Sequence, residues 1–343
     1  MPRIITEGNA LINASEETKI SKKLPVFYNP VMKLNRDISI LLLNTISKKN
    51  MQIGLPLAGS GIRGIRFLQE LKKNKIKTLY INDYKEDFFD VIKANFSLNK
   101  LPSNIDVEVS NEEANLFMMN SSGFDYIDID PFGTPNPFLD IASRRIARDG
   151  IFAVTATDTS SLCGTYETAC KRKYWAKPIR NELKHETGIR ILIRKVQLVA
   201  AQYDKALTPV FSYSKDHYFR VFFQCEKGKS KVDKIIRKHE FYETAGPLWT
   251  GQLFDKKLVK KILKEADDET RKFLSIINEE LDIVGFYDIH AICEKLKIQV
   301  PKYESLMEKI KKKGYKVSRT HFNPFGIKSD ISREEIMEII KNI

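Results

Sequence analysis

Short apolar segments alternate with amphipathic segments along the first part of the chain. Apolar runs of strand length lie at residues 51–57, 78–81, 105–109, 126–129 and 151–155. Apolar side chains at helical spacing fill the intervals, at residues 62–74, 85–99 and 137–147. Strands that alternate with helices in this way predict an α/β fold with a parallel, doubly wound sheet.

An antiparallel hairpin is predicted to close this sheet. A long amphipathic segment, residues 189–206, precedes the β-rich runs LTPVFSYS and HYFRVFFQC, which are separated by a short polar link. Two such runs are typical of antiparallel strands joined by a tight turn. We therefore expect an antiparallel pair at one edge of an otherwise parallel sheet.

The composition changes at Glu226, where the lysine-rich stretch KGKSKVDKIIRKH begins. We place a boundary there and predict two domains, residues 1–226 and residues 227–343. Beyond the stretch, short amphipathic helices are followed by a predicted strand and loop at residues 315–329. This order predicts a smaller α+β domain of winged-helix-like form.

The net charge suggests a class of partner. Lysine and arginine number 57 against 44 acidic residues, which gives a net charge of +13. A basic excess favours polyanions such as nucleic acid, because binding to phosphates releases condensed counterions. A lysine-rich solvated surface explains the same composition equally well, so charge alone leaves both interpretations open.

The sequence contains no pattern typical of a membrane segment or a metal site. No apolar run approaches the roughly 18 residues that a membrane helix needs, and the N-terminus lacks the apolar core of a signal peptide, so we expect a cytoplasmic protein. The four cysteines form no C-x-x-C pair, and the five histidines form no metal motif.

The first predicted strand runs into LAGSGIRGIRF, in which Gly59, Gly61 and Gly64 form a G-x-G-x-x-G pattern. Glycines let the backbone turn sharply and let a ligand approach the amino end of the next helix. Asp83 follows about twenty residues later, where an acid can bind a ribose hydroxyl. The pattern predicts a nucleoside cofactor, either a nicotinamide dinucleotide or S-adenosylmethionine. An ordinary glycine turn with a capping acid is the alternative.

The fourth predicted strand ends in Asp130-Pro131-Phe132-Gly133. The proline ends the strand and fixes the backbone, so we expect the Asp130 carboxylate in the crevice at the carboxyl edge of the sheet. An exocyclic amino group of a base is a poor nucleophile, because its lone pair is delocalised into the ring. A carboxylate and a carbonyl of the turn can hold both N–H groups and aim the lone pair at an electrophilic methyl group. Phe132 offers the base a flat surface, and Gly133 allows close approach.

These four residues resemble the (D/N/S)-P-P-(Y/F) motif of amino-directed class I methyltransferases. Further segments, in chain order, resemble the tRNA guanine-N2 dimethyltransferase family: EGNA (7–10), VFYNPVMKLNRDIS (26–39), GSGIRGIR (59–66), DIDPFGTPNPFLD (128–140), GPLWTG (246–251) and HFNPFGIKSD (321–330). The resemblance extends over nearly the whole chain. Several motifs in the same order are more specific than a single glycine pattern.

The resemblance implies a class I, Rossmann-like methyltransferase domain with an N-terminal extension, followed by a C-terminal tRNA-binding domain. It implies transfer of two methyl groups from S-adenosyl-L-methionine, which becomes S-adenosyl-L-homocysteine, to N2 of guanosine 26 of tRNA by in-line displacement. The partner is then tRNA, and neither a membrane nor an obligate protein partner is indicated. The resemblance implies that Arg36, Arg66, Asp83, Glu113 and Ala114 bind the methyl donor, together with Gly59 and Gly61 of the glycine pattern.

The two arginines are expected to pair with the methionine carboxylate or to brace the pocket, and surface pairing is the alternative. Phe27, Tyr28 and Asn29 precede a proline, and the aromatic pair is predicted to hold a flipped base opposite Phe132. Guanosine 26 lies inside the folded tRNA, so extrusion of the base is expected. The alternative is that both aromatic residues belong to the core.

Residues 170–195 combine many basic side chains with aromatic ones. We predict phosphate contacts and a stacking platform for tRNA there, at Lys171, Arg172, Lys173 and Trp175. The alternative is a solvated helix face with aromatic residues packed below it.

The sequence departs from the family pattern before the GPLW segment. Many relatives carry paired C-x-x-C elements for zinc there, whereas this chain has only Cys225, so we predict no metal. Other functions stay open. They are methylation of another RNA or only once per guanosine, RNA binding without catalysis, and NAD-dependent oxidoreduction, for which no catalytic histidine or tyrosine–lysine pair stands out.

Overall fold

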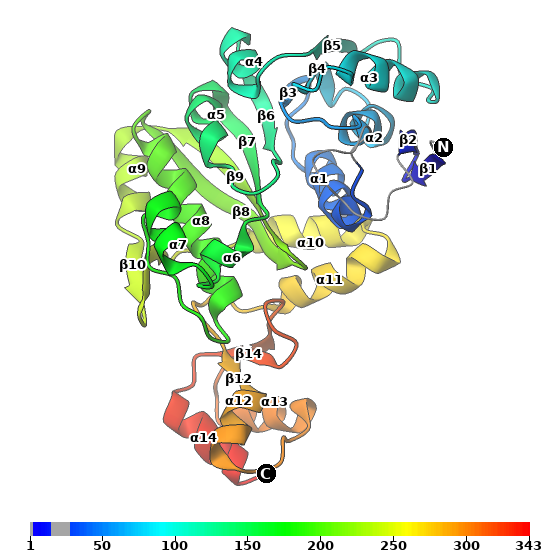
Figure 1. Ribbon diagram of the computed structural model, residues 1–343. Coiled ribbons are helices and arrows are strands. Elements are labelled where there is room, and N and C mark those ends of the chain that lie inside the picture. Colours follow the sequence, from blue (N-terminus) through cyan, green and yellow to red (C-terminus); the bar gives the residue numbers. More distant parts are fainter. Residues whose placement is uncertain (1–2, 15–27) are drawn as a thin grey trace. The chain divides into compact units, whose positions relative to one another are not determined.

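The computed structural model describes residues 3–14 and 28–343 (Figure 1). Its internal contacts divide the chain into two compact units. The first unit consists of Met1–Asp158, Val196–Val210 and Arg220–Ile236. The second consists of Thr159–Lys195, Phe211–Phe219 and Arg237–Ile343. Each unit draws on several stretches of the chain, and the domain boundary at residue 226 stays a prediction.

Within the described residues, a seven-stranded sheet of order β5-β4-β3-β6-β7-β9-β8 forms the framework. Its strands are β3 (Met51–Leu55), β4 (Ile76–Asn82), β5 (Asp106–Ser110), β6 (Phe124–Ile129), β7 (Ile146–Ala156), β8 (Lys205–Lys215) and β9 (Tyr218–Lys227). The five strands β3 to β7 run parallel to one another, and residues 216–217 join β8 to β9 in a hairpin. The predicted doubly wound sheet with a closing hairpin is confirmed.

The strand order reverses beside β3, which lies between β4 and β6. A crevice forms at such a switch point, outside the carboxyl ends of the strands. Strand β6 runs to this point as an almost fully buried strand, in which Phe124, Tyr126, Ile127 and Ile129 are at most 1% exposed. Parallel strands are apolar throughout because helices cover both of their faces. The buried carboxylate of Asp128 in β6 therefore needs partners.

The helices of the first unit cover both faces of its sheet. They are α1 (Lys33–Thr45), α2 (Ile62–Glu70), α3 (Phe88–Ser97), α4 (Ala114–Asn120), α5 (Leu139–Arg145), the last part of α8 (Lys184–Ala201) and α9 (Lys229–Ile236), with short 3-10 turns at Pro30–Met32 and Asn136–Phe138. Helix α1 packs on α2, and α4 packs on α5. Figure 1 shows the first pair on one side of β6 and α5 on the other.

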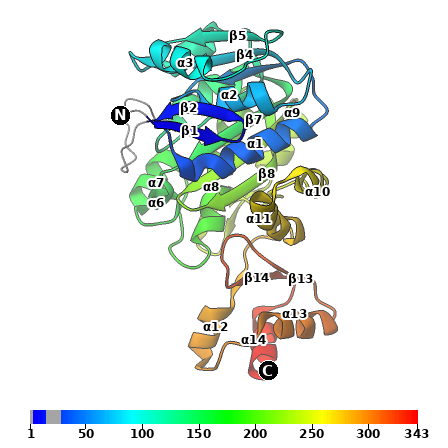
Figure 2. The same cartoon turned by 90° about the vertical axis from the view of Figure 1, so that its right-hand side faces the viewer.

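Two N-terminal strands that the sequence analysis did not predict add a hairpin to this unit. They are β1 (Arg3–Glu7) and β2 (Ala10–Ala14), paired antiparallel. Strand β2 packs on α2 and α3. Figure 2 shows the hairpin running along α1. The hairpin thereby brings Glu7 next to α1 and α2.

Several boundaries differ from the predicted ones for local reasons. Helix α2 ends at Glu70 and not at residue 74, since Leu71 adopts an extended backbone. Strand β7 begins at Ile146 and not at residue 151. Ile146 pairs with Phe124, and the register then shifts across residues 147–150.

The lysine-rich stretch after Glu226, expected as a connector, is a helix. Residues Lys229–Ile236 form α9, and Val232 and Ile235 lie buried on one face of it. These apolar residues are three apart, which is the spacing of neighbours on a helix face. The charge of the stretch concealed this short amphipathic pattern.

The second unit begins with helices and a small hairpin. Its elements are α6 (Thr159–Leu162), α7 (Glu167–Tyr174), the first part of α8 (Lys184–Ala201), β10 (His239–Tyr242), β11 (Ala245–Trp249), α10 (Lys256–Glu265) and α11 (Asp268–Glu279). Asp255 and Asp267 cap α10 and α11 by accepting hydrogen bonds from their first backbone N–H groups. Both helices were predicted from their apolar spacing.

The last part of this unit is a three-stranded sheet with three helices. Its elements are β12 (Tyr287–Asp288), α12 (Ile289–Leu296), α13 (Tyr303–Lys312), β13 (Val317–Arg319), β14 (Gly326–Ser329) and α14 (Arg333–Lys341). Among these strands the order is β12-β14-β13, all antiparallel. Helix α14 was not predicted, although Ser332 and Glu335 form a capping box before it. The winged-helix form stays a prediction.

Candidate active site

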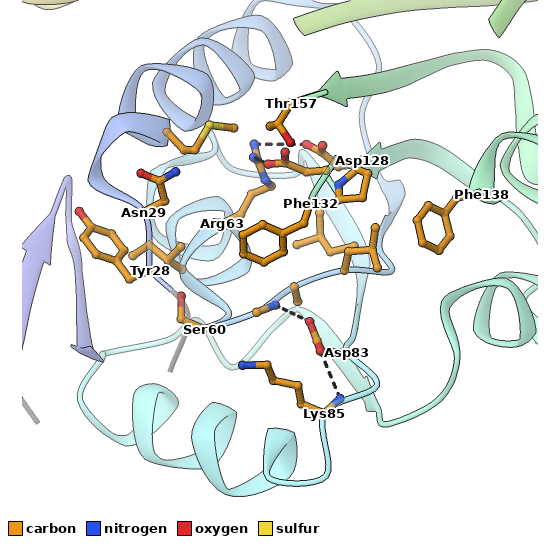
Figure 3. A pocket seen from close by; sticks show the side chains of 18 of the residues that line it. Tyr28, Asn29, Ser60, Arg63, Asp83, Lys85, Asp128, Phe132, Phe138 and Thr157 are labelled. Carbon is orange, nitrogen blue, oxygen red and sulfur yellow. Dashed lines mark hydrogen bonds and ion pairs between the residues drawn. The ribbon is translucent and has the colours of Figure 1, made fainter. Parts of the chain in front are cut away.

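A cavity of about 520 Å³ lies where the carboxyl ends of β3, β4 and β6 meet (Figure 3). Its wall is formed by the segments that follow these strands, by Thr157 after β7, and by residues at and before the start of α1. Apolar and aromatic side chains in this wall are mixed with polar and charged groups that can fix the orientation of a ligand. All these residues belong to the first unit.

The glycine loop after β3 turns the chain sharply into α2. Gly61 is the residue before α2 and has a φ of 77°, in the left-handed region that favours glycine. A Cβ atom on Gly61 would lie 2.1 Å from Cδ1 of Ile92, so a larger residue would also collide with α3. The loop therefore brings the amino end of α2, which favours negative charge, to the cavity.

Asp83 follows β4 and braces the glycine loop. Its Oδ2 accepts a hydrogen bond from the Gly59 N–H at 2.8 Å, and its Oδ1 accepts one from the Lys85 N–H at 3.2 Å. Figure 3 shows both bonds at the lower wall of the cavity. Each carboxylate oxygen has a second lone pair, so Asp83 can still accept hydrogen bonds from hydroxyl groups of a ligand.

Asp130 comes directly after β6 and lines the same cavity. Its side chain is 19% exposed, and its Oδ2 accepts a hydrogen bond from Nη2 of Arg63 at 2.6 Å. This is a short, charge-assisted bond of the strong kind. The carboxylate is thus held in one orientation at the edge of the cavity.

The turn after Asp130 is fastened to the end of β7. The Gly133 N–H donates to Oγ1 of Thr157 at 2.7 Å, and the Thr157 N–H donates to the Gly133 carbonyl at 2.9 Å. Gly133 has a φ of 86°, which explains the glycine at this place. Phe132 is 40% exposed, and Figure 3 shows its ring at the cavity with those of Tyr28 and Phe138. The turn therefore presents an aromatic face from a fixed backbone.

A buried ionic network lies behind Asp130. Arg220 donates to both carboxylate oxygens of Asp128, at 2.6 and 2.7 Å, and the Tyr126 hydroxyl donates to Asp128 at 2.6 Å. Burial alone would raise the pKa of Asp128, but the charges of Arg220 and Arg63 outweigh it and lower the pKa below its ordinary value. Asp128 is therefore a charged anchor inside the sheet.

A second ionic cluster ties the N-terminal hairpin to α1 and α2. Glu7 accepts hydrogen bonds from Arg36 at 2.6 and 2.5 Å, from Arg66 at 2.9 Å and from the Tyr28 hydroxyl at 2.9 Å. Burial raises the pKa of Glu7, but Arg36 and Arg66 more than compensate and lower it to about 2. Glu7 thus holds two cavity residues, Tyr28 and Arg36, in place.

Replacing Glu7 by glutamine is expected to destabilise the protein at neutral pH and to do so less in acid. The folded-state pKa of about 2 is below the ordinary value of 4.5. The stabilisation by the carboxylate is therefore complete above pH 4.5 and is lost as the pH falls toward 2. Urea unfolding of both proteins at pH 7 and pH 3 measures this. We expect a difference on the order of 3 kcal/mol at pH 7 that shrinks in acid. A pH-independent difference would contradict the assignment.

Many of the predicted site residues come together in the cavity. Its lining includes Tyr28, Asn29, Arg36, Gly59, Asp83, Asp130, Pro131 and Phe132. Gly61 and Gly133 adjoin lining residues in the two turns. Phe27 lies outside the described residues.

Other predicted donor-binding residues lie away from the cavity lining. Arg66 is 3% exposed and forms ion pairs with Glu7, with Asp37 at 2.7 Å and with Glu70 at 2.8 Å. It therefore pairs with acidic side chains, as the alternative interpretation of the sequence had it, but in the interior and not at the surface. Glu113 caps α4 by accepting from the backbone N–H groups of residues 115 and 116, and Ala114 is buried at the start of that helix.

The predicted tRNA contacts of α7 belong to the second unit. Lys171, Arg172 and Lys173 are exposed in the last turn of α7, and Trp175, just after it, is 53% exposed. Nζ of Lys195 lies 2.9 Å from the centre of the Trp175 ring. One face of the indole is thus covered by a cation.

Sequence reasoning missed several residues at the site. Arg63, Thr157 and Phe138 line the cavity, and Arg220 holds Asp128 beneath it. Arg63 had a signal, since it lies inside the GSGIRGIR segment directly after the glycine turn. The sequence did not reveal the partners of Thr157 and Arg220, because their contacts join residues 24 and 92 positions apart.

The described residues contain neither a metal-binding cluster nor a membrane-spanning helix. Among residues 3–14 and 28–343, no three histidine, cysteine or acidic side chains are grouped so that they could hold a metal ion. No helix in the same residues is long and apolar enough to cross a membrane.

Comparison with known proteins places this geometry in a family context. The family model of N2,N2-dimethylguanosine tRNA methyltransferases matches residues 8–244 and 238–341. The chain is 39% identical to a tRNA (guanine(26)-N(2)/guanine(27)-N(2))-dimethyltransferase of Aquifex aeolicus, over 99% of this chain and 96% of that protein. It is 38% identical to a tRNA (guanine(26)-N(2))-dimethyltransferase of Methanobrevibacter smithii, over 99% and 97%.

A solved structure agrees with these sequence matches. The structure of Trm1 from Pyrococcus horikoshii with S-adenosyl-L-methionine superimposes with a TM-score of 0.90. It is 38% identical in sequence, and the match covers 98% of this chain and 99% of that one. The Rossmann-like class I methyltransferase fold expected from the sequence is confirmed.

Proposed function

The chain belongs to the N2,N2-dimethylguanosine tRNA methyltransferase family, and on that premise we propose how its cavity performs the reaction. The protein is an S-adenosyl-L-methionine-dependent enzyme that methylates the N2 amino group of guanosine in tRNA. The observation that carries the proposal is the convergence of two turns on one cavity. The glycine loop with Asp83 forms one wall, and Asp130 with Phe132 forms another.

The wall formed by the glycine loop suits the methyl donor. Asp83 can accept hydrogen bonds from ribose hydroxyls, and the amino end of α2 together with Arg36 favours the methionine carboxylate. The cavity also offers the apolar and aromatic surface that an adenine ring needs. When bound there, S-adenosyl-L-methionine supplies an electrophilic methyl group on a sulfonium.

The wall formed by the Asp130 turn suits the guanine. Oδ1 of Asp130 and the carbonyl of Pro131 can accept the two hydrogen atoms of the amino group, which orients the nitrogen lone pair toward the methyl donor. The carboxylate also stabilises the positive charge that develops on the nitrogen. Phe132 provides a surface on which the purine ring stacks.

The base has to leave the tRNA stack to reach this cavity. A guanosine inside a folded tRNA cannot present its amino group to a turn at the edge of a sheet, so extrusion is required. Tyr28 and Asn29 line the side of the cavity formed by the segment before α1, and Tyr28 is fixed by its bond to Glu7. We propose that Tyr28 faces the extruded base from the side opposite Phe132.

Replacing Asp83 by alanine should weaken binding of the methyl donor without removing the chemistry. The change removes the acceptor for the ribose hydroxyls and leaves the Gly59 N–H without its partner. We therefore expect the dissociation constant for S-adenosyl-L-methionine to rise about 10- to 100-fold, which corresponds to the loss of one or two hydrogen bonds to a charged group. Calorimetric titration with S-adenosyl-L-methionine measures it. An unchanged dissociation constant would count against the ribose assignment.

The basic stretch of α7 is the proposed tRNA contact of the second unit. Lys171, Arg172 and Lys173 are exposed and can pair with phosphates, while the exposed Trp175 can stack on a base. Contacts of this kind position a folded RNA by its shape and not by its sequence. We further propose a cytoplasmic location, because tRNA is the substrate.

The position and number of methyl groups are the finer part of the proposal. We propose two methyl groups on guanosine 26. The name of the Aquifex relative includes guanine 27, and that of the Methanobrevibacter relative does not. Unmodified tRNA transcripts with a guanosine at both positions, at 26 only and at 27 only should be incubated with labelled S-adenosyl-L-methionine and digested for nucleoside mass analysis.

Dimethylguanosine in the transcripts that carry guanosine 26 supports the proposal. Label in the transcript with guanosine at 27 only would extend the activity to a second position. Monomethylguanosine as the final product would overturn the double transfer. No label in any transcript would overturn the enzymatic assignment and leave RNA binding without catalysis.

A further inference from the structure

Arg63 makes more contacts at the site than its place in the first turn of α2 suggests. Its Nη2 donates to Oδ2 of Asp130 at 2.6 Å and to Oδ1 of Asn35 at 3.0 Å. Its Nη1 donates to Oγ of Ser39 at 3.0 Å and lies 3.2 Å from Oδ2 of Asp128. Arg63 is 7% exposed, and Figure 3 shows its guanidinium at the cavity wall beside Asp128. All five side chains belong to the first unit.

The four charged side chains of this network form two ion pairs, Arg220 with Asp128 and Arg63 with Asp130. Asp128 is bound through both oxygens by Arg220, which is fully buried. Nη1 of Arg63 lies 3.2 Å from Oδ2 of Asp128, whereas Nη2 of Arg63 lies only 2.6 Å from Oδ2 of Asp130. Arg220 therefore neutralises Asp128, and the charge of Arg63 is directed to Asp130.

The shape of the guanidinium decides what this contact does. A planar fork with several N–H donors can bind Asp130, Asn35 and Ser39 at once, whereas a lysine ammonium at the same place cannot match all three directions. Asn35 and Ser39 lie on α1 and are fully buried. The guanidinium group of Arg63 is thus held by two residues of α1, and it holds the carboxylate of Asp130 in turn.

We propose that Arg63 is a positioning residue for methyl transfer. Arg63 holds Oδ2 of Asp130, and in the described part of the chain Oδ1 makes no hydrogen bond of its own, so Oδ1 stays available at the cavity that Asp130 lines. Oδ1 is then the acceptor for the guanine amino group. This inference rests on the proposed function, because it assigns Arg63 a role in that reaction and none in binding of the methyl donor.

The variants Arg63→Lys and Arg63→Ala test this role. The lysine keeps the positive charge and so protects the fold, but it loses the fork. We expect the single-turnover rate of methyl transfer, at saturating S-adenosyl-L-methionine and tRNA, to fall about 100-fold in Arg63→Lys. This is the effect of a misplacement of a reacting group by about 1 Å. The rate should fall further in Arg63→Ala. The dissociation constant for S-adenosyl-L-methionine should stay within about 3-fold, which is less than the loss of one hydrogen bond to a charged group.

Chemical rescue separates positioning from a merely structural role. Added guanidinium, at a concentration that does not unfold the protein, should restore part of the single-turnover rate of Arg63→Ala and leave the rate of the wild type unchanged. Arg148→Ala is the matched control, because Arg148 is exposed and outside the cavity. Its rate should equal that of the wild type with and without guanidinium.

The outcomes distinguish this inference from the proposed function. A wild-type rate in Arg63→Lys, or a loss confined to the affinity for S-adenosyl-L-methionine, would overturn the positioning role while the wild type still methylates tRNA. A lower rate in Arg63→Ala that guanidinium does not raise would also overturn it. Absence of transfer by the wild type would overturn the proposed function and this inference together.

Discussion

Replacing Asp130 by alanine is expected to lower the rate of methyl transfer to tRNA by about 10³-fold, the effect of removing one charge-stabilising group from an active site. The carboxylate holds the amino group and takes up the positive charge that forms on its nitrogen. Asp130 is bonded to Arg63, whereas Asp83 is the residue that braces the glycine loop, so we expect the affinity for S-adenosyl-L-methionine to stay within about 3-fold. Single-turnover assays and calorimetric titration measure the two effects separately.

The asparagine variant is the matched control for Asp130. Its side-chain oxygen can still accept a hydrogen bond from the amino group, but it carries no negative charge. We expect Asp130→Asn to retain more activity than Asp130→Ala and less than the wild type. If Asp130→Ala instead abolished binding of the methyl donor at an unchanged saturated rate, Asp130 would belong to the donor site.

Replacing Arg220 by methionine is expected to destabilise the protein by about 3–5 kcal/mol, since it leaves the buried carboxylate of Asp128 without its principal partner. Arg220 is fully buried and donates to Asp128, Thr155, Ser39 and Tyr126. Methionine fills much of the same volume but donates no hydrogen bond. The midpoint of urea unfolding at pH 7 measures the change.

A double variant provides the control for the Arg220 prediction. In Arg220→Met with Asp128→Asn the unpaired charge is absent, so much of the lost stability should return, as is usual when a buried ion pair is replaced as a whole. Equal destabilisation of the single and double variants would show that packing around Arg220, and not the charge of Asp128, determines the effect.

The sheet was predictable because its signals are local. The central parallel strands β3, β4 and β6 are short and mostly buried, and β6 is buried almost completely. The start of β7 was not predictable, since Ile146 joins the sheet only by pairing with Phe124 across a register shift. When the start of a strand is determined by pairing with a residue more than 20 positions away, the apolar pattern of the strand itself does not indicate where it begins.

The site was predictable where function depends on backbone turns. Gly61 needs its left-handed conformation, and Asp130 stands between a buried strand and a proline, so both positions are visible in the sequence. The partners that hold these turns were not visible. Thr157 and Arg220 reach the site through tertiary contacts, which the sequence of their own segments does not show.

The arginines show why a motif does not fix a role. Arg63 and Arg66 are three residues apart in the GSGIRGIR segment, and the resemblance singles out Arg66 for the methyl donor. Arg66 is bound by Glu7, Asp37 and Glu70, whereas Arg63 lines the cavity and holds Asp130. Only the folded arrangement of charges distinguishes the two, because both lie on α2 and both are buried.

The central claim, that the methyl group is transferred to N2 of guanine, is tested most directly by changing one group of the substrate. Two tRNAs, with guanosine or with inosine at position 26, should be incubated with the protein and labelled S-adenosyl-L-methionine. Inosine differs from guanosine only by the absence of the 2-amino group. We predict dimethylguanosine in the first tRNA and no label at position 26 of the second, although the second still competes for binding. Label on inosine 26 would contradict the account, because the methyl group would then be on another atom.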